Sequence, residues 1–135
     1  MASVLLTKRI EFAAAHRYMK AEWDEAKNRA VFGPCYNPPA HGHNYMVEVT
    51  VAGEVDPKTG MVVNLFDLKR ILLHVLEEFD HKNLNLDTEE FSLLNPTAEN
   101  IAIVIHNILR AHIDTRLDLQ VRLYETERNF VDYPV

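Results

Sequence analysis

Apolar and polar residues alternate along several stretches of the chain, as is typical of strands that bury one face. The alternation is clearest near the start, where Ile10, Phe12 and Ala14 are separated by charged or small residues. It predicts four strands, at residues 4–16, 43–52, 119–125 and 130–133. Turn-forming residues at 53–60, followed by an extended run at 61–63, also suggest a hairpin after the second strand.

Two other stretches repeat their apolar residues at helical spacing. The first covers residues 64–79 and begins with Asn64 as a plausible N-cap. The second begins near residues 95–97, where Asn or Thr suits the cap and Pro suits the first helical position. A shorter helix is expected at residues 24–32, because Gly33 follows it as a stop signal.

The order of these elements is two strands, two helices and two strands, which predicts an α+β fold. We expect a four-stranded antiparallel sheet with two helices packed on one face. A length of 135 residues suits one hydrophobic core, so residues 1–135 are expected to form a single domain.

Composition and charge indicate which general class of protein the chain belongs to and which binding partners are disfavoured. The chain is 47% hydrophobic and has a net charge of -6, which fits an ordered globular protein and argues against binding to nucleic acid or to an anionic membrane surface. Cys35 is the only cysteine, so no intrachain disulfide can form, and a lone thiol suits a reducing compartment. No secretory signal and no apolar run of ~20 residues is evident, so we expect a cytoplasmic location.

Histidines carry the main candidate chemistry. His41 and His43 lie two apart at the start of the second predicted strand, so both rings should point to the same face. Two neutral imidazoles side by side suit Zn²⁺, although an isolated His-x-His pair is more often structural or simply exposed. His16 ends the first strand on its apolar face and is the expected third ligand. Three histidine ligands leave an open position, as in catalytic zinc sites.

Other titratable residues stand near these histidines or at the ends of predicted elements. Cys35 could be a fourth ligand, but we favour it as a proton-transferring base, because a nearby cation lowers the pKa of a thiol. Asp80 could orient His81 and raise its basicity, or the pair could simply end a helix in solvent. Glu125 follows an apolar strand face, where a carboxylate needs a cation or N–H donors unless it reaches water. A flat ring with adjacent N–H and NH₂ groups, such as guanine or a pterin, would satisfy both carboxylate oxygens.

These residues fall in segments that resemble the 6-pyruvoyl-tetrahydropterin synthase family, which also includes 6-carboxytetrahydropterin synthases. The resemblance covers nearly the whole chain and is carried by residues 12–16, 35–45, 56–61, 80–84, 97–100 and 124–126. The five-residue gap between Cys35 and His41 is similar to the animal 6-pyruvoyl enzymes. The chain departs from the usual pattern at Pro39 and Ala40, which stand where the family has Asn-Gly, and at Ala98, which replaces a threonine.

The resemblance implies a tunnelling fold, a homohexamer made of two stacked trimers, and active sites between subunits. It implies a lyase that converts 7,8-dihydroneopterin triphosphate to 6-pyruvoyl-tetrahydropterin with loss of triphosphate, in tetrahydrobiopterin biosynthesis, with Mg²⁺ accompanying the triphosphate. By the same resemblance, three histidines bind zinc, Cys35, Asp80 and His81 transfer protons, and Glu125 anchors the pterin with Thr97 nearby. The zinc ligands would be His16, His41 and His43.

Three questions stay open from the sequence. The product could instead be 6-carboxytetrahydropterin, with acetaldehyde released alongside triphosphate, as in queuosine and deazapurine biosynthesis. The chain could also be a pterin-binding or zinc module without turnover, although an open three-histidine site, a thiol and an Asp-His pair together favour an enzyme. For the triphosphate, Arg17, Lys20 and Lys82 are equal candidates.

Overall fold

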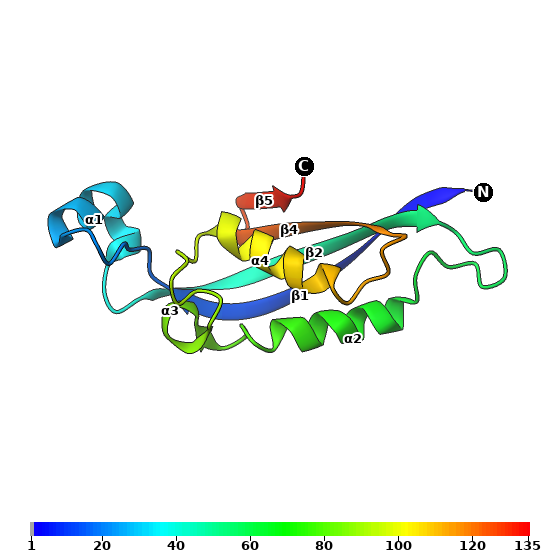
Figure 1. Ribbon diagram of the computed structural model, residues 1–135, viewed down its shortest axis with the longest axis horizontal. Helices are drawn as coiled ribbons and strands as arrows, with labels where there is room; N and C mark the ends of the chain where they lie inside the picture. The colour runs from blue at the N-terminus through cyan, green and yellow to red at the C-terminus, as the bar shows by residue number, and fades with distance from the viewer. Residues whose placement is uncertain (1) are drawn as a thin grey trace.

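The computed structural model describes residues 2–135 and contains one mixed sheet of five strands in the order β3-β1-β2-β4-β5. The strands are β1 (Ser3–His16), β2 (His41–Glu54), β3 (Lys82–Asn83), β4 (Asp118–Thr126) and β5 (Asn129–Tyr133). Strands β1 and β2 form a long antiparallel pair that runs the length of the molecule (Figure 1). β4 pairs antiparallel with β2, and β5 with β4.

The period-two pattern places one face of each long strand in the core. Phe12 and Ala14 of β1 lie on the same buried face as Tyr45 and Val47 of β2. The register pairs His16 with His41 across the two strands. The alternation therefore brings the end of β1 and the start of β2 together with their histidines beside the core, as the sequence predicts.

Helices cover the apolar face of the sheet. Two of them, α2 (Leu65–Leu76) and α4 (Ala98–Arg110), pack on it. The short α3 (Leu84–Asp87) follows β3, and α1 (Glu25–Phe32) with the 3₁₀ turn η1 (Gly33–Tyr36) lies between β1 and β2. α2 packs against β1 and α4, while α4 packs against β4 and β5. Asn64 caps α2 by accepting a hydrogen bond from the Phe66 N–H, and Thr97 caps α4 by accepting from the Asn100 N–H.

The predicted four-stranded antiparallel sheet is wrong in one respect. A fifth strand, β3, pairs parallel with β1 through Ala14 and Ala15, which makes the sheet mixed. β3 has only two residues, too few for an alternation of apolar and polar side chains, so no pattern could reveal it.

Two element boundaries also differ from the prediction. The hairpin expected after β2 is reduced to a single bridge between Asp56 and Met61, and residues 61–63 form no strand. Helix α2 ends at Leu76 rather than near Phe79, and turns follow it, in which the Phe79 and Asp80 N–H groups both donate to the Leu76 carbonyl. The turn delivers residues 80–83 to the open edge of β1.

The segment between β1 and β2 forms a small lobe of α1 and η1 that projects beyond the end of the sheet (Figure 1). Gly33 ends α1 with a positive φ of 56°, as the sequence predicts, whereas Asp24, expected as the first helical residue, is the N-cap. Within residues 2–135, no helix has both the length and the apolar character needed to cross a membrane.

Candidate metal centre

Three histidine rings meet at the end of the β1–β2 pair that carries the α1 lobe. One donor nitrogen from each of His16, His41 and His43 lies within 4.8 Å of the others. The centroid of the His16 ring lies 4.6 Å from that of His41 and 5.0 Å from that of His43. The cluster forms because His41 and His43 share one face of β2, and the strand register places His16 opposite His41.

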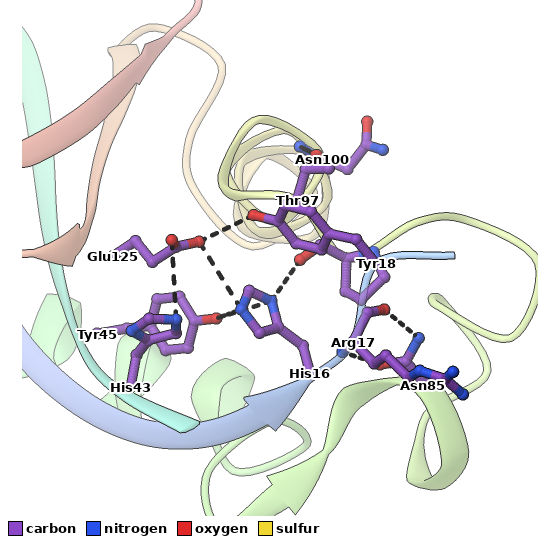
Figure 2. A network of polar contacts seen from close by, with 10 residues as sticks. His16, Arg17, Tyr18, His43, Tyr45, Asn85, Thr97, Asn100 and Glu125 are labelled. Carbon is purple, nitrogen blue, oxygen red and sulfur yellow. Dashed lines mark hydrogen bonds and ion pairs between the residues drawn. The ribbon is translucent and has the colours of Figure 1, made fainter. Parts of the chain in front are cut away.

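His16 is fully buried and its orientation is fixed by the backbone before α4. Its Nδ1 lies 2.7 Å from the carbonyl oxygen of Pro96, which can only accept, so Nδ1 carries the hydrogen and Nε2 presents a lone pair. Figure 2 shows this bond and the side chains around it. Burial lowers the pKa of His16 to about 4, so the ring is neutral at pH 7 and suited to binding a cation.

His43 supplies a second sign that the cluster fits a metal ion. Burial lowers the pKa of His43 as well, which favours its neutral form. Its Nε2 is buried without a hydrogen-bond partner among residues 2–135, and an unsatisfied buried nitrogen is unfavourable unless a ligand occupies it.

The spacing of the rings is close to what a metal requires. Tetrahedral zinc with bonds of about 2.0–2.1 Å places its ligand atoms roughly 3.3–3.4 Å apart. The three donor nitrogens, within 4.8 Å of one another, can reach that spacing by small side-chain rotations. Imidazole donors suit Zn²⁺ and several other first-row ions, so the three histidines are positioned to hold a metal ion of this class.

Glu125 lies at the rim of the histidine cluster. Its Oε1 is 3.7 Å from Nε2 of His43, and its Oε2 is 3.9 Å from Nε2 of His16. Both separations exceed hydrogen-bond length, so the carboxylate faces the two rings without bonding either. Its Oε2 accepts a hydrogen bond of 3.1 Å from the Tyr18 hydroxyl (Figure 2). The Glu125 side chain is 22% exposed, and one hollow of the surface is lined by His43 and Glu125 together.

Two tyrosines join this network and were missed by the sequence reasoning. The Tyr45 hydroxyl lies 3.1 Å from Nδ1 of His16, and burial raises the pKa of Tyr45. Burial, with Glu125 as a further cause, raises the pKa of Tyr18, so its hydroxyl stays a donor at neutral pH. Tyr45 could have been found from its place two residues after His43 on the same strand face, whereas Tyr18 lies beyond the end of β1 and has no periodic signal.

Cys35 lies in η1, close to this network. Its carbonyl oxygen accepts a 2.9 Å hydrogen bond from the Tyr18 N–H, which ties the loop carrying the thiol to the end of β1. Burial and then the Glu125 carboxylate raise the pKa of the Cys35 thiol. A cation at the histidines would act in the opposite direction, so the thiolate predicted from the sequence requires a positive charge nearby.

Asp80 and His81 sit at the outer edge of β1. Asp80 accepts a 2.9 Å hydrogen bond from the Ala13 N–H, and its carboxylate lies 3.0 Å from Nδ1 of His81. The Ala13 bond, helped by His81, lowers the pKa of Asp80, so the carboxylate is charged and can orient the imidazole. The His81 side chain is 82% exposed and therefore stands outside the three-ring cluster, although His43 and His81 line a common hollow.

Thr97 has a structural task at the start of α4. Its hydroxyl oxygen accepts a 3.1 Å hydrogen bond from the Asn100 N–H as the N-cap. It follows Pro96, whose carbonyl holds the ring of His16. The sequence-predicted site residues therefore fall into two groups: one around the histidine cluster, including Glu125, and the solvent-facing pair of Asp80 and His81.

Comparisons of the sequence and of the fold with known proteins point to one family. The family model described as 6-pyruvoyl tetrahydropterin synthase matches residues 5–134. The 6-pyruvoyl tetrahydrobiopterin synthase of Pongo abelii is 43% identical over 129 residues, which is 95% of this chain and 89% of that protein. The Homo sapiens enzyme of the same name is 42% identical over the same shares. The solved structure of Caenorhabditis elegans 6-pyruvoyl tetrahydropterin synthase superposes with a TM-score of 0.93 at 38% identity, covering 98% of this chain and 96% of that one.

Proposed function

Because the chain belongs to the 6-pyruvoyl tetrahydropterin synthase family, we propose that it is a lyase that converts 7,8-dihydroneopterin triphosphate to 6-pyruvoyl-tetrahydropterin with loss of triphosphate. The observation that carries this proposal is the open cluster of three histidines with a carboxylate at its rim. A binding site for a metal alone needs no carboxylate held off the metal ligands, whereas a site for a pterin needs an acceptor for its N–H groups.

The metal in this proposal is Zn²⁺, held by His16, His41 and His43. The fixed tautomer of His16 and the unpartnered Nε2 of His43 support this assignment. When bound, the metal would supply Lewis acidity toward the hydroxyl groups of the substrate side chain.

Glu125 is proposed to orient the pterin ring. Its Oε1 has no hydrogen-bond donor among residues 2–135, and its Oε2 accepts one bond from Tyr18, so lone pairs remain for the adjacent N–H and NH₂ groups of a pterin. A carboxylate that receives two parallel N–H bonds fixes both the position and the rotation of a flat ring. Thr97 is proposed to contact the pterin as well, because its hydroxyl oxygen caps α4 and its hydroxyl hydrogen has no acceptor among residues 2–135.

Cys35 and the Asp80–His81 pair are proposed to move protons between the side chain and the ring. The Asp80 carboxylate beside Nδ1 of His81 would hold the hydrogen there and leave Nε2 as the basic nitrogen. The proposal includes a hexamer built from two trimers, in which the exposed His81 ring would serve a site shared with a neighbouring copy. The lone cysteine supports a reducing compartment such as the cytoplasm.

The decisive experiment is one incubation of zinc-loaded protein with 7,8-dihydroneopterin triphosphate, followed by chromatography and mass spectrometry of the pterins and of acetaldehyde. We expect a 6-pyruvoyl product without acetaldehyde. A 6-carboxy product with acetaldehyde would replace the proposed reaction with that of 6-carboxytetrahydropterin synthase. Zinc and pterin binding without turnover would instead identify a binding module.

Variants of the two proposed proton-transfer groups test whether each takes part in the reaction. Cys35→Ala and His81→Gln should each slow turnover by at least about a hundredfold, the usual contribution of a positioned acid or base. His112→Gln is the matched control, because His112 lies just beyond α4 and its side chain hydrogen-bonds only the Ile108 carbonyl among residues 2–135. Equal rates for His81→Gln and His112→Gln would remove His81 from the proposed mechanism.

A further inference from the structure

Tyr18 contacts three separate parts of the candidate site. Its hydroxyl donates to Oε2 of Glu125 at 3.1 Å, and its backbone N–H donates to the carbonyl of Cys35 at 2.9 Å. Its ring packs edge-on against His16, with centroids 5.0 Å apart. One residue therefore touches a metal ligand, the substrate-binding carboxylate and the loop of the thiol, as Figure 2 shows for the first two.

The backbone around Tyr18 is held on both sides, so the hydroxyl has a defined position. The Arg17 N–H donates to the side-chain oxygen of Asn85 at 2.8 Å, and the Asn85 amide returns a 2.8 Å bond to the Arg17 carbonyl. The Met19 N–H donates to the side chain of Asn95 at 3.0 Å. Because two distant segments fix the residues on either side, the Tyr18 hydroxyl keeps its position and can orient the Glu125 carboxylate.

Glu125 depends on this single donor. Among residues 2–135, the Tyr18 hydroxyl is the only group that donates a hydrogen bond to the Glu125 carboxylate. The nearest alternative partners are the two imidazoles at 3.7 and 3.9 Å. These separations are only about 0.3–0.6 Å longer than the ligand spacing of tetrahedral zinc, so a released carboxylate could turn and bind a metal held by the histidines.

We propose that Tyr18 is a positioning residue, which holds Oε2 of Glu125 so that the carboxylate stays available to the pterin and does not become a metal ligand. The expected effect on pterin binding rests on the proposed function, whereas the expected effect on metal binding rests only on the geometry of the histidine cluster. Loss of the hydroxyl should weaken pterin binding and strengthen metal binding at the same time. A purely structural role for Tyr18 would weaken both.

The test uses Tyr18→Phe, which keeps the ring and the backbone bond to Cys35 and removes only the hydroxyl. Neopterin binding is measured by quenching of its fluorescence, and zinc affinity by competition with a chelator. We expect the neopterin dissociation constant to rise about tenfold or more, as for loss of a hydrogen bond to a charged group, and the zinc dissociation constant to fall about tenfold. Tyr133→Phe, in β5 against His106, is the control and should change neither.

The same measurements in a Glu125→Ala background, which removes the acceptor of the Tyr18 hydrogen bond, decide whether Tyr18 acts through Glu125. We expect Tyr18→Phe to have no further effect there, because its partner is gone. A loss of neopterin binding that persists in this background would mean that Tyr18 contacts the pterin itself, and it would overturn the positioning role. Unchanged zinc affinity, or unchanged neopterin binding, in the single variant would also overturn it.

The outcomes separate this inference from the proposed function. If the wild-type protein binds zinc but no neopterin, the proposed function fails, and the zinc affinities of Tyr18→Phe with and without Glu125→Ala still test whether Tyr18 keeps the carboxylate away from the metal. If the wild-type protein binds neopterin and Tyr18→Phe binds both probes as the wild type does, the inference about Tyr18 fails while the pterin assignment stands.

Discussion

Zinc binding should stabilise this protein through His43 in particular, and His43→Gln is the perturbation that tests it. His43 is chosen because its buried Nε2 has no hydrogen-bond partner among residues 2–135, so its replacement breaks no bond of the metal-free fold. His16 would be a poorer choice, since its replacement would also remove the bond to the Pro96 carbonyl.

The expected magnitude follows from ligand linkage. Free zinc at a thousand times its dissociation constant stabilises the native state by about 4 kcal/mol. A chain of 135 residues has an unfolding entropy of roughly 280 cal/mol/K, so the midpoint of thermal unfolding should rise by about 14 °C. Four-ligand zinc sites are worth about 10–16 kcal/mol, or roughly 3–4 kcal/mol per ligand, so loss of one ligand weakens binding by about two to three orders of magnitude. The same zinc concentration should then raise the midpoint of His43→Gln by only about 1–5 °C.

The assay is thermal unfolding of chelator-stripped protein in a zinc buffer, at one protein concentration, with bound zinc measured by mass spectrometry of the metal. We expect one zinc per chain in the wild type. His112→Gln removes a histidine outside the cluster and should keep the full shift. Equal shifts for His43→Gln and His112→Gln, or no shift in the wild type, would refute the assignment of the cluster as the metal site.

Three further predictions concern the fold that holds the site. Metal-free protein should lose up to about 3 kcal/mol of stability as pH falls from about 6.5 to about 4, because burial lowers the pKa of His16 to about 4 and the unfolded chain binds a proton in this range that the folded chain does not. In urea unfolding, the free energy of unfolding of His16→Gln should therefore change less with pH than that of the wild type, and an equal change would contradict this. Asn28→Ala should open the α1 lobe to hydrogen exchange and cost about 2–3 kcal/mol, because the buried amide bonds both the N–H and the carbonyl of Lys20, whereas Asn107→Ala on the exposed side of α4 should not. Thr97→Ala should cost about 1 kcal/mol in urea unfolding through loss of the α4 cap and Thr97→Ser should restore it; equal stabilities would show that the cap contributes nothing.

Much of the candidate centre could be predicted from local patterns. Alternation with a period of two decides which face a side chain occupies, so the faces of His16, His41 and His43 follow from the sequence alone. The start of α4 was predictable to within two residues: Asn or Thr was expected as the cap and Thr97 is the cap, but Pro96 precedes the cap and does not occupy the first helical position. These features depend only on residues close together in the chain, so they can be recognised from the sequence.

Other features were beyond such patterns. The two-residue strand β3 has no period to detect, and the sheet is mixed only because a turn after α2 brings Lys82 and Asn83 beside β1. The sequence suggested that Asp80 and His81 form a pair, and the structure places them as one, but only the tertiary arrangement turns the His81 ring to solvent.

The contacts that orient the site were decided by the tertiary structure alone. The ring of His16 is fixed by the Pro96 carbonyl 80 residues away, and the Glu125 carboxylate is held by the hydroxyl of Tyr18 across 107 residues. Each contact joins a strand residue to a loop residue, Pro96 or Tyr18, and loop residues carry no repeating signal for their partners. Hydrophobic periodicity selects the face on which each histidine lies, whereas the pairing of β4 with β2 and the packing of α4 on β4 set which atoms those rings and the Glu125 carboxylate can reach.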